Sequence, residues 1–162
     1  SGGMVKRAAL ARAIVMDPRL LFCDEPSAGL DPIVASALDD LILKLRDAMR
    51  MTIVVVTHEL DSAFKIADRI ALLHKGEMVF VGPPSDLRLQ EDPRIQNFLN
   101  RRAEQVAIDA EEYGPSAALV IFLLKDSERF VQLFEGVKGG LPPEQASLVV
   151  RIAKAQSQRQ MA

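Results

Sequence analysis

The sequence predicts an α/β fold with parallel core strands, followed by a β-hairpin and a helical tail. Two short apolar runs, Leu20–Cys23 and Thr52–Val56, are typical of strands buried on both faces of a sheet. Helix-like stretches precede and follow each run, and Gly76 separates two further strand-like segments. Because strands that alternate with helices form parallel sheets with right-handed crossovers, these observations favour the α/β class.

The first three helices are predicted from apolar spacing and from end signals. A helix is expected over residues 3–16, which are rich in alanine and follow a glycine loop. Asp17-Pro18 should end this helix, because the residue before a proline avoids helical backbone angles. Asp31-Pro32 should begin the second helix, with an aspartate cap and a proline in the first turn. A third helix is expected over Leu60–Ala67.

The remainder of the chain divides near Asn100. Before that point, a hairpin is predicted around Lys75-Gly76-Glu77, with short helices at residues 85–89 and 94–100. After it, residues 116–134 mix apolar and charged side chains in a helix-like way, and residues 144–158 resemble an amphipathic helix. We therefore expect a first domain over residues 1–100 and a helical extension of unknown role over residues 101–162.

Composition restricts the function. The 20 basic and 22 acidic residues give a net charge of −2, so nothing in the charge favours binding to nucleic acid. The longest purely apolar run, residues 117–124, is too short for a membrane-spanning helix, which needs about 20 residues. One cysteine, Cys23, excludes an intrachain disulfide and is consistent with a reducing compartment.

Two adjacent acids follow the first predicted strand. Asp24 and Glu25 would lie where ligands gather in open α/β sheets, beyond the carboxyl ends of the strands. Neighbouring side chains at a strand end point to different sides, so one acid can serve a metal ion while the other faces a water molecule. Taken alone, these two residues are equally consistent with a pair of acids in a solvent-exposed loop.

Two further features suit phosphate chemistry. Ser1-Gly2-Gly3 precedes a helix, whose free N–H groups and positive dipole end attract anions, although a plain glycine turn would look the same. His58 follows the second strand, where an imidazole can donate a hydrogen bond to a phosphate oxygen, although a lone histidine is more often structural.

The order of these blocks resembles the second half of an ABC-type ATPase domain, a partial P-loop NTPase fold. Ser1-Gly2-Gly3-Met4 resembles the signature loop, Leu20–Glu25 the Walker B strand with its glutamate, Ser27–Asp31 the D-loop, and Thr57-His58-Glu59 the switch histidine region. Met4 departs from the family, where glutamine is commonest.

The resemblance implies a role for each residue and names the cofactors, ATP and Mg²⁺. Asp24 would hold Mg²⁺ through its water shell, Glu25 would polarise the attacking water, and His58 would sense the γ-phosphate. Ser1, Gly2 and Gly3 would contact the ATP of the opposite subunit in a homodimer. Asp31 would couple the two sites at the dimer interface, in addition to capping its helix.

One element of this family is missing from the sequence. The phosphate-cradling loop with the pattern G-x-x-x-x-G-K-[ST] does not occur in the 162 residues, and the chain begins inside the signature block. We expect a fragment of a longer chain that lacks the Walker A half and shows no ATPase activity by itself. The alternative is a natural protein that begins at Ser1.

The resemblance also suggests a subfamily. The string after Ser1, together with Asp92–Leu99, is similar to the ATPase of the Mla-type transporter, which moves phospholipid between bacterial membranes. This implies a cytoplasmic protein on the inner face of the plasma membrane, with permease subunits, an MCE lipid-binding protein and a small regulatory subunit as partners. The alternatives are the ATPase of another importer or exporter, or an ABC protein without a transport role.

Overall fold

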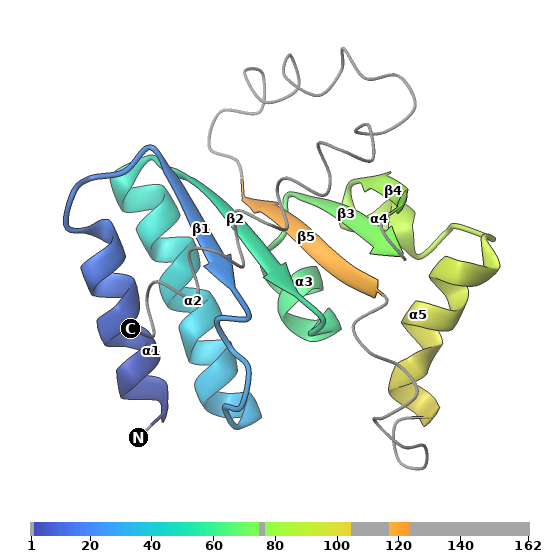
Figure 1. Cartoon of the computed structure of the whole chain (residues 1–162), viewed down its shortest axis with the longest axis horizontal. Helices are drawn as coiled ribbons and strands as arrows, with labels where there is room; N and C mark the ends of the chain where they lie inside the picture. Colours follow the sequence, from blue (N-terminus) through green and yellow to red (C-terminus); the bar gives the residue numbers. More distant parts are fainter. Residues whose placement is uncertain (1, 75–76, 105–116, 124–162) are drawn as a thin grey trace.

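The computed structural model describes residues 2–74, 77–104 and 117–123, which form an α/β fold around one five-stranded sheet (Figure 1). The elements, in chain order, are α1 Gly2–Ile14, β1 Leu20–Asp24, α2 Pro32–Met49, β2 Thr52–Thr57, α3 Leu60–Ile66, β3 Arg69–His74, β4 Glu77–Gly82, α4 Pro84–Leu87, α5 Pro93–Glu104 and β5 Ala117–Leu123. The α/β class, the two apolar strands, the three early helices and the hairpin are therefore confirmed.

The strand order in the sheet is β1-β2-β5-β3-β4. β1 and β2 are parallel, with Phe22 opposite Val54, and β3 and β4 form the antiparallel hairpin. β5 lies between the two halves and is antiparallel to both of its neighbours. Within the described residues, the predicted parallel arrangement therefore holds for one pair of strands only.

The helix-like interpretation of residues 116–134 is wrong for residues 117–123, which form β5. This segment contains Val120, Ile121 and Phe122, whose branched or aromatic side chains favour strands, and it is short and free of charge. The charged residues that suggested a helix begin only at Lys125. The other helices predicted for the tail lie outside the described residues.

The core joins the sheet to its helices. Four consecutive apolar residues of β2, from Ile53 to Val56, are buried, as expected for a strand inside a sheet. Ile53 and Val55 belong to a cluster of buried side chains from the helices and the other strands, among them Leu10, Leu21, Leu38, Ile42, Ile70, Leu72, Leu87, Ile95 and Phe98. This packing fixes the ends of β1 and β2, where the acids and the histidine follow.

Helices α1 and α2 lie side by side next to β1 (Figure 1). The start of α2 is capped as predicted, because Oδ1 of Asp31 accepts hydrogen bonds from the main-chain N–H groups of Ile33 and Val34 at 3.1 and 3.0 Å. The start of α1 approaches α2 closely. A Cβ atom at Gly3 would lie 2.7 Å from Cγ1 of Val34, so glycine is needed there for packing.

Candidate functional site

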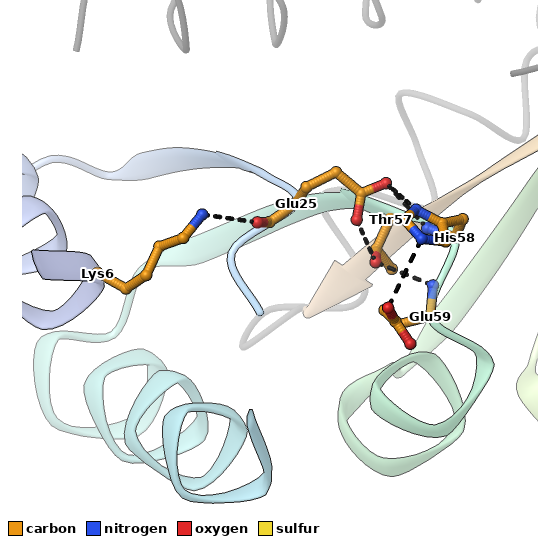
Figure 2. Close-up of polar contacts among 5 residues, drawn as sticks. All are labelled: Lys6, Glu25, Thr57, His58 and Glu59. Atoms are coloured by element: carbon orange, nitrogen blue, oxygen red, sulfur yellow. Dashed lines mark hydrogen bonds and ion pairs between the residues drawn. The ribbon is translucent and has the colours of Figure 1, made fainter. Parts of the chain in front are cut away.

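The candidate site lies at the edge of the sheet where the parallel strands β1 and β2 end. Glu25 follows β1, Thr57 ends β2, and His58 and Glu59 connect β2 to α3 (Figure 2). Carboxyl ends of parallel strands meet at one edge, so the fold brings Glu25 next to His58, which lies 33 residues later in the sequence.

The carboxylate of Glu25 is held on both of its oxygens. Oε2 accepts a hydrogen bond from the hydroxyl of Thr57 at 2.9 Å. Oε1 accepts one from the main-chain N–H of His58 at 3.1 Å and lies 2.7 Å from Nδ1 of the same residue. Three polar groups thus fix the orientation of this carboxylate, which is 32% exposed.

The main chain of Glu25 is held as well. Its φ angle is 44°, in the left-handed region that non-glycine residues rarely adopt and that functional sites often contain. Its N–H donates to the carbonyl oxygen of Val56 at 2.8 Å, and its own carbonyl oxygen accepts from Nζ of Lys6 at 3.1 Å (Figure 2). Helix α1 therefore contacts the acid directly through Lys6.

The sequence motifs did not assign a role to Lys6 or Thr57. Lys6 lies in α1, nineteen residues before Glu25, and no local pattern links the two. Thr57 gave a weak signal, because a hydroxyl at the end of an apolar strand and directly before a histidine needs a polar partner when it is buried.

Charge couples His58 to its two acidic neighbours. The hydrogen bond that His58 donates to the carboxylate of Glu25 is the main cause that raises the pKa of His58 above its ordinary value of 6.5, and the negative charges of Glu25 and Glu59 add to it. Nε2 of His58 lies 3.6 Å from Oε1 of Glu59. Partial burial opposes the shift but does not cancel it.

This pair leads to a prediction about pH. Because the pKa of His58 is raised by folding, the pair stabilises the folded state fully below pH 6.5, and this stabilisation is lost as the pH rises through the raised value. In the complete protein without nucleotide, an NMR titration should give a pKa above 6.5 for His58. Glu25→Gln should lower it more than Glu59→Gln does. An equal pKa of His58 in the wild type and in both variants would contradict the pairing of His58 with Glu25.

The other candidate residues occupy separate positions. Asp24 ends β1 opposite Val56, one residue before Glu25. Asp31 lies at the cap of α2, where its side chain is used by the helix. Gly2 and Gly3 begin α1, as a phosphate-binding helix start would require, and Ser1 lies outside the described residues.

The sheet edge carries carboxylates, the ligand type that a magnesium ion bound with a nucleotide would need. Magnesium prefers oxygen ligands and usually takes one or two carboxylates, with phosphates and water completing its shell. Asp24 is a carboxylate of this kind and lies one residue before Glu25. In the part of the chain that the structure describes, no group of three or more His, Cys, Asp or Glu side chains is placed to hold a metal ion.

Thiol chemistry is not expected at this edge. Cys23 lines an apolar cavity of about 280 Å³ between α1, β1 and α2, together with Lys6 and Leu10. Burial raises the pKa of its thiol to about 12, so the reactive thiolate is absent at neutral pH. No helix in the described ranges is long and apolar enough to cross a membrane.

Comparison with known proteins identifies relatives of this chain. No family model matches the chain. It is 35% identical over 161 residues to the probable ribonucleotide transport ATP-binding protein mkl of Mycobacterium tuberculosis, which covers 99% of this chain and 45% of that protein. It is 42% identical over 102 residues to the choline transport ATP-binding protein OpuBA of Bacillus subtilis, covering 62% of this chain and 27% of that protein.

A third relative comes from a lipid system. The intermembrane phospholipid transport system ATP-binding protein MlaF of Escherichia coli is 42% identical over 104 residues, covering 64% of this chain and 39% of that protein. The chain thus spans less than half the length of the curated relatives it matches. The mycobacterial match extends through almost all of residues 101–162, the segment for which the motifs gave no resemblance.

The relatives and the motifs agree on the kind of protein. All three relatives are named as ATP-binding proteins of transport systems, although each name gives a different transported substrate. The resemblance drawn from the signature, Walker B, D-loop and switch blocks is therefore confirmed: this chain is a relative of the ATP-binding proteins of ABC transporters and corresponds to part of their length.

Proposed function

We propose that the protein containing this chain is the ATP-binding and ATP-hydrolysing subunit of an ABC transporter, and that it drives a separate membrane permease. The observation that carries this proposal is the carboxylate of Glu25, held at the edge of the sheet between Thr57 and His58. An oriented carboxylate beside a histidine is suited to activating a water molecule in phosphoryl transfer.

Each residue has a distinct task in this proposal. Glu25 orients the attacking water and accepts a hydrogen bond from it. His58, whose side chain is 57% exposed, leaves Glu25 to donate a hydrogen bond to the γ-phosphate. Asp24 would hold a magnesium ion, which would supply positive charge next to the phosphates.

A second copy of the chain completes the site. Gly2 and Gly3 lie at the positive end of α1, where Gly2 is exposed and Gly3 is buried. We propose that they, with Ser1, bind the nucleotide held by the opposite subunit of a homodimer. Asp31, the last residue of the D-loop, would then couple the two nucleotide sites.

We further propose a phospholipid as the cargo and the inner face of the bacterial plasma membrane as the location. The support is the Asp92–Leu99 string and the 42% identity to MlaF. The partners would be permease subunits, an MCE lipid-binding protein and a small regulatory subunit. An importer or exporter with another cargo is the alternative that the mkl and OpuBA relatives favour.

The experiment is an ATPase and transport assay on the complete protein with its permease. We expect release of inorganic phosphate from ATP that stops when EDTA removes magnesium, and stimulation by phospholipid carried on the MCE protein. Stimulation by choline or a ribonucleotide instead would support the alternative cargo. A complete protein that hydrolyses no ATP under any of these conditions would overturn the proposal.

A further inference from the structure

Thr57 forms a hydrogen-bonded bridge that none of the motif assignments uses. It is the last residue of β2, and it is only 1% exposed. Its hydroxyl contacts Oε2 of Glu25 at 2.9 Å and the main-chain N–H of Glu59 at 3.1 Å (Figure 2). A buried hydroxyl with two partners is a fixed part of the site.

The direction of both hydrogen bonds follows from the chemistry of the partners. The N–H of Glu59 can only donate, so the oxygen of Thr57 accepts from it. An ionised carboxylate can only accept, so the hydroxyl hydrogen of Thr57 points to Glu25. The backbone after β2 therefore orients the hydroxyl, and the hydroxyl in turn orients the carboxylate.

The two oxygens of Glu25 are held by groups of different mobility. Oε1 is contacted by the main-chain N–H of His58 and by its imidazole, and this side chain is 57% exposed and can turn away. Oε2 is contacted by Thr57, which is buried at the end of β2 and pairs with Leu119 of β5. When His58 moves to a phosphate, the imidazole contact on Oε1 is released, but the contact on Oε2 persists.

We infer that Thr57 is a positioning residue for ATP hydrolysis: its hydroxyl holds Oε2 of Glu25 so that Oε1 faces the attacking water. This inference rests on the proposed function. A glutamate side chain has several rotatable bonds, and without the Thr57 hydroxyl the carboxylate would sample orientations that do not meet the water. Small misplacements of a catalytic group reduce turnover strongly.

The test is Thr57→Val in the complete protein with its permease. Valine keeps the shape of threonine but has no hydroxyl. We expect kcat to fall about 10- to 100-fold while KM for ATP changes less than about twofold, because the loss concerns orientation in the transition state. Thr57→Ser keeps the hydroxyl and should restore most of kcat. Thr52→Val, the same change at the other end of β2, should leave kcat unchanged.

A second comparison separates positioning through Glu25 from a general structural effect. In a Glu25→Gln background, Thr57→Val should reduce the residual rate less than about twofold, because the group it positions has already been lost. If Thr57→Val does not fold, as judged by circular dichroism, Thr57→Ala replaces it in both backgrounds.

Three results would overturn the inference. They are an unchanged kcat in Thr57→Val, a serine variant as impaired as the valine variant, or an equal loss with and without Glu25. In each of these cases a wild-type protein whose turnover depends on Glu25 would leave the proposed function standing. A wild-type protein without ATPase activity would instead remove the proposed function itself.

Discussion

Glu25→Gln in the complete protein is expected to reduce ATP turnover by about 10²- to 10⁴-fold, the range that a positioned general base contributes. The amide has the shape of the carboxylate, so Thr57 and His58 keep their places around it. It cannot accept a proton from water, and it carries no charge. ATP binding should persist, because nucleotide affinity depends on phosphate contacts elsewhere.

Because ATP binding persists while hydrolysis is lost, this variant should form a trapped complex with ATP. With ATP bound and not hydrolysed, two copies should remain closed on their nucleotides, which size-exclusion chromatography with ATP would show as a dimer. Glu59→Gln is the matched control, since Glu59 is the neighbouring acid, lies 3.6 Å from His58 and makes no side-chain contact with Glu25 among the hydrogen bonds described. It should retain most of the activity. Unchanged turnover in Glu25→Gln would exclude Glu25 as the catalytic carboxylate.

His58→Ala is expected to reduce turnover by about 10²- to 10³-fold, the cost of removing one donor that stabilises developing charge on oxygen. Two effects combine in this variant. The γ-phosphate loses the imidazole donor of the proposed mechanism, and Oε1 of Glu25 loses its 2.7 Å contact with Nδ1. Steady-state ATPase assays should show the loss in kcat, with ATP binding retained in a filter-binding assay.

The chain offers a matched control for this variant as well. His74, the other histidine, ends β3. His74→Ala should keep turnover within about twofold of the wild type, since substitutions away from a site usually have small effects. Equal losses in the two histidine variants would indicate that a general loss of stability, rather than phosphate sensing, explains the result.

The sequence was sufficient for the parts of this structure that depend on local signals. Apolar runs marked β1 and β2, Asp31-Pro32 marked the start of α2, and the acids at the end of β1 marked the edge of the sheet where the site lies. These features depend on spacing, on caps and on the alternation of elements. The same signals placed Glu25 and His58 at neighbouring strand ends before any distance between them was known.

The contacts that could not be predicted from the sequence join segments that are distant along the chain. The bond from Lys6 to the carbonyl of Glu25 depends on how α1 packs against the sheet, and no pattern of residues specifies it. The hydroxyl of Thr57 meets the carboxylate of Glu25 across 32 residues of sequence, and no local pattern specifies that contact or the positive φ angle of Glu25. β5 was missed because a short apolar run fits a helix or a strand equally well until its neighbours are known.

The central place of β5 has a consequence for synthesis on the ribosome. Ile53 of β2 pairs with Leu123, so the strand that completes the sheet emerges long after its neighbours. Until then, one side of β2 and one side of β3 present unsatisfied backbone groups that can pair with another nascent chain. Pairings this remote in sequence form slowly. Chaperone demand during translation should therefore peak between the appearance of residue 74 and that of residue 123.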